Sequence, residues 1–308
     1  MRKYDKDQCT ASIHALLQSH QEIAKYIEKK KIEDALSILQ QCQEDAIRVG
    51  TCIESQEGEG TEAVHMLEEY CELVYQTYDN LIQGNTVHFR QIEKKLRKVL
   101  QKADTDLQNG IRTQLEVVFL PYKAAMWDSL ESVWQAAQDD PDCTAYVIPI
   151  PYYDRDEYGR VKELHYEADL YPENIPLTDY RDYDFEERHP DMIFIHNPYD
   201  GINSVTSTLS FFYSENLKKY TDCLVYIPYF VLDESMLSHG VVDEHTQHLC
   251  CVPAVRYADY VIVQSECVKN IYVDVLTQYY GKHTEDYWRK KVLGLGSPKV
   301  DRIMNFQK

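Results

Sequence analysis

Long apolar runs and the common cofactor-binding motifs are missing from this sequence. No stretch of its 308 residues approaches the roughly 20 consecutive apolar residues that a membrane-spanning helix needs. The first residues, Met1 to Asp5, lack the apolar core of a signal peptide. Gly-x-Gly-x-x-Gly, Walker and Gly-x-Ser-x-Gly motifs are also absent. We therefore expect a cytoplasmic protein, at most peripheral to a membrane, with no transmembrane segment and no cofactor.

Disulfide, zinc and nucleic-acid signatures are equally scarce. The nine cysteines are odd in number and form no Cys-x-x-Cys pair, so most of them should be small buried residues. The formal net charge of −19 repels phosphate backbones and anionic lipid, so we expect no nucleic-acid partner. The plainer interpretation of that charge is solubility. One cluster of metal-binding residue types matches no common zinc spacing, and we expect no metal site. It comprises His239, Asp243, Glu244, His245 and His248.

What the first part of the sequence does contain is helical periodicity, from residue 8 to about 108. Four apolar stripes at three-to-four-residue spacing alternate with short breaks. The stripes cover residues 13–27, 32–53, 64–82 and 87–107. Thr61 and Thr86 are candidate N-caps. The pattern predicts a helical bundle over residues 1–110, which either serves as a dimerisation or docking module, giving a homo-oligomer in the first case, or packs as an extension of the second domain.

After Gly110 the pattern changes to short apolar runs separated by helical stretches. Six largely apolar runs predict parallel strands covered on both faces. They occupy residues 115–120, 145–150, 192–196, 224–228, 260–263 and 292–295, with helices over 126–137, 209–220 and 267–280 among them. The sequence thus predicts a Rossmann-like parallel α/β domain over residues 111–308, preceded by the all-α bundle.

Residues 151–191 interrupt this second domain. They hold seven tyrosines and 13 acidic against 5 basic side chains, which predicts a long loop or an exposed hairpin. Long ordered insertions often lie over binding sites, and tyrosine suits a sugar or polyol site as well as a wet interface. A solvated acidic loop is the alternative interpretation.

Polar residues follow the first strand at the edge where open parallel sheets bind ligands. Lys123 offers a positive charge for phosphate, and Trp127 and Asp128 stand near it in the sequence. These three are candidate substrate-binding residues. Asp128 and Ser129 are also ordinary helix caps, and that alternative stays open.

The densest polar group follows the third strand. A neutral His196 could take a proton from an acceptor hydroxyl, with Asp200 to orient it, so both are candidate catalytic residues. Asn197 and Tyr199 beside them are candidate substrate contacts, although Asn-Pro and Asp-Gly are also turn signals. Later strands add three further candidates for substrate binding, Tyr229, Ser265 and Ser297. Ser265 is foremost a natural helix cap.

Two segments near the end of the sequence resemble a known family when taken together. They are Tyr257–Glu266, with Ala-Asp-Tyr-Val-Ile-Val-Gln-Ser, and Gly294–Ile303, with Gly-Leu-Gly-Ser-Pro-Lys-Val-Asp. Residues 112 to 308 resemble the N-terminal domain of GT-B-fold transferases, most of all the bacterial CDP-glycerol glycerophosphotransferase family of teichoic-acid synthesis. The resemblance implies the acceptor-side half of a transferase for cell-wall or glycan synthesis. Its acceptor would carry a hydroxyl on a polyol, sugar or surface polymer.

Two departures from that family stand out. The family has a Trp-His-Gly-Thr-Pro motif with a His thought to be catalytic, whereas this sequence has Ile227-Pro228-Tyr229-Phe230 there, so His196 would have to substitute. The family's C-terminal domain binds the nucleotide donor, and we expect residues 1–308 to bind such a donor only with a second domain.

The alternative function is a non-catalytic binding or scaffold protein that oligomerises through its helices. A nucleotide-sugar epimerase of similar architecture ranks last.

Overall fold

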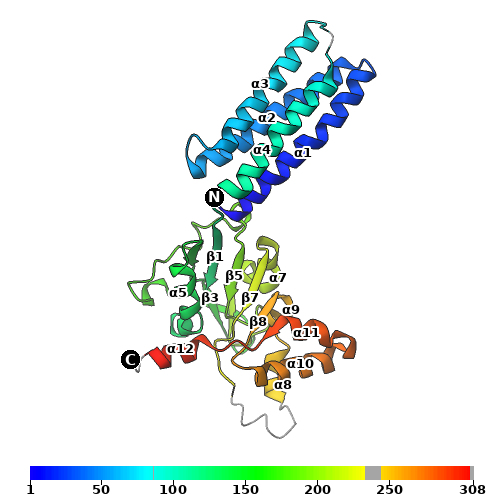
Figure 1. The fold of residues 1–308 in the computed structure, drawn as a ribbon. Coiled ribbons are helices and arrows are strands. Elements are labelled where there is room, and N and C mark those ends of the chain that lie inside the picture. The colour runs from blue at the N-terminus through cyan, green and yellow to red at the C-terminus, as the bar shows by residue number, and fades with distance from the viewer. Residues whose placement is uncertain (86, 233–243, 306–308) are drawn as a thin grey trace. The chain divides into compact units, whose positions relative to one another are not determined.

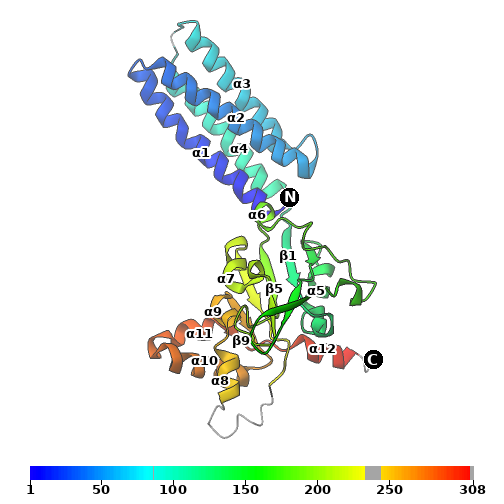
Figure 2. The ribbon, with the colours of Figure 1, turned by 180° about the vertical axis from the view of Figure 1, so that it is seen from behind.

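The computed structural model describes the backbone of residues 1–85, 87–232 and 244–305. The chain folds into two compact units, Met1–Gln114 and Leu115–Lys308 (Figures 1 and 2). The predicted cap Thr86 lies outside the described residues. So do His239 and Asp243 of the cluster at which no metal site is expected. No helix in the described ranges is both long enough and apolar enough to cross a membrane.

The first unit is a bundle of four helices, as the apolar stripes predict. Consecutive helices pack against each other, and the fourth also packs against the first. The helices are α1 (Lys3–Glu28), α2 (Ile32–Glu57), α3 (Glu62–Ile82) and α4 (Phe89–Gly110). The side chain of Thr61 accepts a hydrogen bond from the Val64 N–H, which confirms Thr61 as an N-cap. The buried Lys6 ammonium donates to the carbonyl oxygens of Gln108 and Ile111, and so satisfies backbone acceptors near the end of α4.

The second unit is built on a six-stranded sheet in which every pairing is parallel, which confirms that prediction. Its strand order is β2-β1-β5-β7-β8-β9. The strands are β1 (Leu115–Leu120), β2 (Cys143–Val147), β5 (Met192–Ile195), β7 (Cys223–Tyr226), β8 (Tyr260–Ile262) and β9 (Val292–Leu293). The chain builds the sheet outward in one direction from β1 and then in the other from β5. The boundary between β1 and β5 is therefore the switch point at which such sheets bind ligands.

Helices cover both faces of this sheet. Alternate residues of β1 belong to two separate apolar cores: Val118 and Leu120 to one, Val117 and Phe119 to the other. The first core is completed by α7 (Ser214–Leu217), α9 (Pro253–Tyr257), α10 (Glu266–Tyr280) and α11 (Glu285–Lys291). The second is completed by the 3-10 helix η1 (Ala124–Ser129) and by α5 (Glu131–Asp139), and α12 (Pro298–Asn305) packs on these two helices. Two further short helices are α6 (Phe185–Arg188) and α8 (Glu244–Cys250).

Two of the predicted helices are broken. The stretch 126–137 is divided between η1 and α5, and 209–220 consists of η3 (Ser210–Phe212), α7 and η4 (Lys218–Tyr220). In the second case polar side chains compete for the backbone: Asn216 Nδ2 donates to the Ser210 carbonyl at 2.7 Å. Apolar periodicity does not register such local competition, so it predicts a longer helix than forms.

The insertion forms a hairpin, one of the two structures predicted for it, and a strand pairing that the sequence analysis missed. Strands β3 (Tyr152–Arg155) and β4 (Val161–His165) pair in antiparallel fashion, and η2 (Ala168–Leu170) follows them. A third strand, β6 (Thr206–Thr208), pairs with β3 from more than 40 residues away along the chain, giving a second sheet of order β4-β3-β6. This sheet holds the insertion in a fixed place beside the ends of β1 and β5.

Candidate functional site

His196 fills the switch point between β1 and β5. Its side chain has no exposed surface. Its Nε2 accepts a hydrogen bond from the Tyr122 N–H at 2.9 Å, and its Nδ1 lies 2.8 Å from Ser129 Oγ. The Ser129 hydroxyl donates to the Met126 carbonyl, so it can only accept from a protonated Nδ1. The ring therefore ties the residue after β1 to the end of η1 as a neutral Nδ1–H tautomer.

This environment makes His196 a poor base. Burial is the main reason that its pKa is lowered to about 3, because the charged ring would lose its hydration, and the nearby positive charge of Lys299 contributes in the same direction. Both ring nitrogens are already engaged, and the rings of Tyr122 and Tyr229 stand edge-on to it at centroid distances of 5.7 and 6.1 Å. In this arrangement His196 reaches no acceptor hydroxyl, and its catalytic role stays a prediction.

Asp200 does not orient His196, contrary to the sequence interpretation. Its carboxylate accepts hydrogen bonds from the N–H and the hydroxyl of Ser214, at 2.9 and 2.6 Å, at the start of α7. Asp200 adopts a left-handed backbone conformation with φ 47°, which Asp tolerates better than most residues. Burial raises its pKa to about 6, although the bonds from Ser214 act in the opposite direction. The sequence places the two residues close together, but the turn points them to different partners.

Three other predicted contacts serve the fold. Trp127 is 2% exposed and packs against the Trp134 and Tyr171 rings in the core under η1. Asp128 binds the Lys299 ammonium through both carboxylate oxygens, at 2.6 and 2.7 Å, and does not cap a helix. Asn197 is largely buried at the turn after β5. Trp127 and Asp128 are therefore not available to a ligand in the way the sequence suggests.

Lys123 is the predicted residue that the structure leaves open to a ligand. Its ammonium lies 4.7 Å from the ring centroid of Tyr152 and 5.5 Å from that of Tyr122, and its side chain is half-buried. No carboxylate of the described residues is within ion-pairing distance of it. The nearby Glu167 accepts hydrogen bonds from the Tyr152 hydroxyl and the Ala124 N–H. The Lys123 ammonium thus lies on aromatic faces at the switch point and pairs with no carboxylate of the described residues. Such a group suits a phosphate or carboxylate of a ligand.

Tyr199 and Tyr229 form the neighbouring wall of this edge. Both are half-buried, and a side-chain hydrogen bond joins them. The Tyr199 ring also stacks on His248 with a centroid distance of 6.4 Å. Burial raises the pKa of Tyr229, so its hydroxyl keeps its proton and can donate or accept a hydrogen bond. The substrate-binding role of Tyr199 and Tyr229 stays a prediction.

Tyr152 and Glu167 are the members of this edge that the sequence analysis missed. Both lie in the insertion. Its length and its tyrosine and acid content suggested a segment over a binding site, but not which strands would pair or in which register. Only the pairing of β3 with β6 brings Tyr152 beside Lys123.

Ser297 lies in a separate, very small cavity at the ends of β7 and β8, with a volume of about 10 Å³. Its hydroxyl and that of the fully buried Tyr272 have no hydrogen-bond partner within the described part of the chain. The remaining lining is mostly apolar: Ile227, Pro228, Phe230, Leu232, Ile262, Val263, Gln264, Val268 and Gly296. Ser265 caps α10, with its Oγ accepting from the Val268 N–H, which confirms the capping interpretation.

The two glycines of the Gly-Leu-Gly-Ser segment are required for different reasons. A Cβ on Gly294 would lie 2.6 Å from the Glu266 nitrogen and 2.6 Å from the Ser265 carbonyl carbon, so only glycine lets the segment after β9 approach the start of α10. Gly296 has open space around it but a φ of +117°, which side-chain-bearing residues rarely adopt.

We expect Gly294→Ala to destabilise the second unit by about 2 kcal/mol, because the clash is with backbone that cannot rotate away. Gly296→Ala should cost about 1 kcal/mol through its backbone conformation alone. Urea unfolding followed by tryptophan fluorescence measures this, because all three tryptophans lie in the second unit. A Gly294→Ala variant as stable as the wild type would contradict the close approach.

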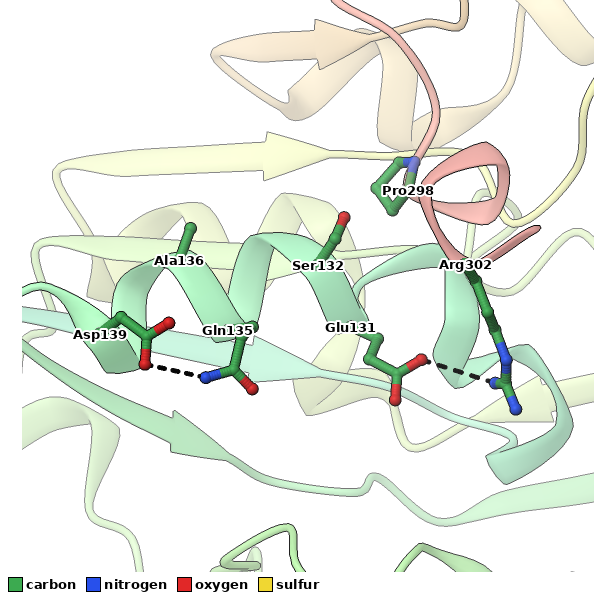
Figure 3. Close-up of a pocket in the computed structure, with 7 residues that line it drawn as sticks. All are labelled: Glu131, Ser132, Gln135, Ala136, Asp139, Pro298 and Arg302. Carbon is green, nitrogen blue, oxygen red and sulfur yellow. Dashed lines mark hydrogen bonds and ion pairs between the residues drawn. The ribbon is translucent and has the colours of Figure 1, made fainter. Parts of the chain in front are cut away.

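A larger hollow of about 820 Å³ lies between α5 and α12 (Figure 3). Its charged side chains are paired: Glu131 with Arg302 at 3.5 Å, and the Asp139 carboxylate with the amide of Gln135 at 2.9 Å. The Ser132 hydroxyl donates to Asp301, so these contacts fasten α12 to α5. We read this hollow as a seam between two helices and place the candidate site at the switch point.

Comparison of the chain with protein-family models, with curated proteins and with solved structures finds no match. The likeness to the CDP-glycerol glycerophosphotransferase family rests on the quoted sequence segments. What the coordinates define is a doubly wound parallel α/β unit together with a helical unit. No group of three or more potential metal-binding side chains comes together within the described residues.

Proposed function

We propose that the Leu115–Lys308 unit is the acceptor-side domain of a GT-B-type transferase that binds a phosphorylated polyol or sugar at the switch point. The observation that carries the proposal is the Lys123 ammonium, which lies over two tyrosine rings without an anionic partner among the described residues. A phosphate would supply that partner, and the half-buried Tyr199 and Tyr229 would offer hydroxyls and ring faces to the polyol. A nucleotide-activated donor would be held by a second domain, in the same polypeptide or another.

The binding step is testable with sn-glycerol 3-phosphate. Lys123→Met should weaken its binding at least about tenfold, since a charge-assisted contact of roughly 1.5–3 kcal/mol is lost, while Lys123→Arg should keep part of it. Lys219→Met is a matched control, because Lys219 lies just before the amino end of β7, at the opposite end of the sheet. Isothermal titration calorimetry reports the affinities. Equal affinity of the wild type and Lys123→Met would refute the phosphate contact.

The assignment of the donor to a second domain has its own test. Calorimetry with CDP-glycerol or a UDP-sugar should detect no tight complex with residues 1–308. A tight complex would move the donor site into this chain, and would leave the Lys123 result to decide the acceptor site separately.

A non-catalytic binding or scaffold protein is the second candidate. The complete burial of His196 and its two engaged nitrogens favour it, since the predicted base is used for structure. His196→Gln separates the two functions, because an amide can still accept from the Tyr122 N–H and donate to Ser129. In a transfer assay with a completed enzyme, loss of turnover with retained binding favours catalysis by His196. Turnover equal to that of the wild type would assign the proton transfer to another residue, and absence of turnover in the wild type itself favours the scaffold.

A further inference from the structure

The helical unit has a groove on its outer surface between α2 and α3, helices that lie side by side in both views (Figures 1 and 2). Its volume is about 420 Å³. Residues at helical spacing line it from each side. They are Gln43, Ala46, Ile47, Gly50, Thr51 and Glu54 of α2, and Val64, Leu67, Glu68, Cys71, Glu72 and Tyr75 of α3.

The floor of the groove is apolar and partly uncovered. Ala46, Val64 and Leu67 are buried at its base, whereas Ile47 and Tyr75 are each 54% exposed. Two large apolar side chains this exposed on neighbouring helices form an apolar patch. Contact of this patch with water is unfavourable, and such patches often mark interaction sites. The four-helix core itself does not need them, because the core-facing stripe of α2 runs through other residues, such as Leu39 and Ile53.

Gly50 is the most informative residue of this floor. Glycine weakens the middle of a helix relative to alanine, so its presence asks for a reason. Packing within the bundle gives none, because a Cβ built on Gly50 meets no atom within 4 Å. Gly50 is buried at the base of the groove, and the space that a Cβ would occupy there lets another helix approach closely.

The charge of the groove selects the partner. Glu54, Glu68 and Glu72 line it, and no lysine or arginine does. Over their full lengths α2 carries six acidic residues and one basic one, and α3 carries five acidic residues and neither lysine nor arginine. A second copy of this chain that docked the same face would bring these carboxylates together, so like-charge repulsion opposes a symmetric dimer here.

We propose that the α2–α3 groove binds an amphipathic helix of a partner protein, with small and aliphatic residues facing Gly50 and lysine or arginine along its flanks. Helix-in-groove recognition of this kind uses apolar anchors at positions i, i+3, i+4 and i+7. The Gly50 floor receives the anchors, and the glutamate rim pairs with the basic flanks. Because the rim is exposed, its contribution falls as salt screens it.

A designed peptide tests the proposal on the full chain. A fluorescein-labelled peptide of about 14 residues, roughly four helical turns, carries leucine and alanine on one face and lysine on the flanks. Its twin has glutamate in place of every lysine. Fluorescence anisotropy should show micromolar binding of the basic peptide, weaker binding at high salt, and no binding of the acidic twin.

Matched variants locate the binding. Gly50→Leu fills the floor and should weaken binding about tenfold or more, while circular dichroism confirms the helical fold; Gly50→Ala, which adds one methyl group, should give a smaller loss. The double variant Glu68→Gln/Glu72→Gln should lower both the affinity and its salt dependence, whereas Glu69→Gln, on the same helix but outside the groove, should change neither.

Three results would overturn the proposal. One is equal binding of the basic and acidic peptides, and another is binding of the basic peptide that Gly50→Leu leaves unchanged. The third is sedimentation showing a dimer of the chain that Gly50→Leu dissociates, which would assign the groove to a second copy instead.

Discussion

Glu116→Ala should destabilise the second unit by about 4 kcal/mol, the largest loss we expect from one substitution. Glu116 sits near the start of β1 with 3% of its surface exposed. Its carboxylate accepts hydrogen bonds from Arg188 Nε at 2.8 Å, from Arg188 Nη2 and from the Tyr183 hydroxyl. Arg188 also lies 5.0 Å from the ring centroid of Tyr146. Removing the carboxylate leaves these donors around a buried gap and takes away the counter-charge of Arg188.

The measurement is urea unfolding followed by tryptophan fluorescence, which reports only on this unit. A useful comparison is the double variant Glu116→Leu/Arg188→Met, which should recover a large part of the loss because both charges disappear together. Glu131→Ala, at the more exposed pair with Arg302, should cost less than about 0.5 kcal/mol. If Glu116→Ala and Glu131→Ala cost the same, the buried pair does not hold α6 to the sheet.

The second large effect concerns stability at acid pH, where the buried groups His196 and Asp200 act in opposite directions. His196 has a pKa of about 3 in the folded protein against an ordinary value of 6.5, so the unfolded chain binds the proton first. The stability from its neutral ring is complete above pH 6.5 and is lost as the pH falls toward 3. Asp200 has a pKa of about 6 against an ordinary 3.8, so the folded protein binds its proton first. Acidification from pH 6 to 3.8 therefore favours folding through Asp200.

Asp200→Asn should reveal the His196 effect. Between pH 6.5 and pH 4 the variant's second unit should lose about 3 kcal/mol, at roughly 1.4 kcal/mol per pH unit, while the wild type loses much less. Asparagine keeps an acceptor for the Ser214 N–H, so the fold should persist. Tryptophan-detected unfolding at a series of pH values gives both curves. Parallel curves for the two proteins would show that Asp200 does not titrate in this range.

Much of the fold could be predicted from local pattern. Apolar periodicity gave all four helices of the bundle, and largely apolar runs gave all six strands of the parallel sheet, within a few residues. The caps Thr61 and Ser265 could be predicted for the same reason. A cap bonds to a backbone N–H three residues away, so the information lies in one short segment.

The candidate site was harder to predict because its geometry depends on distant residues. His196 and Asp200 look like a base and its partner in sequence, yet Ser129 and Tyr122 take up the ring and Ser214 takes up the carboxylate. Each is a polar group that must be paired once it is buried, and the available partners come from other elements.

The sequence by itself determined the four helices of the bundle and the six strands of the parallel sheet, and that Lys123 follows the first strand. Those properties follow from side-chain spacing and from hydrogen bonds between near neighbours. Only the tertiary structure decided that the order of strand addition reverses beside Lys123, that the β3–β6 pairing places Tyr152 near its ammonium, and that Gly50 lies at the base of a groove. The reason is that strand pairing and helix packing join residues tens of positions apart, and the energy of those contacts exists only after the chain has folded.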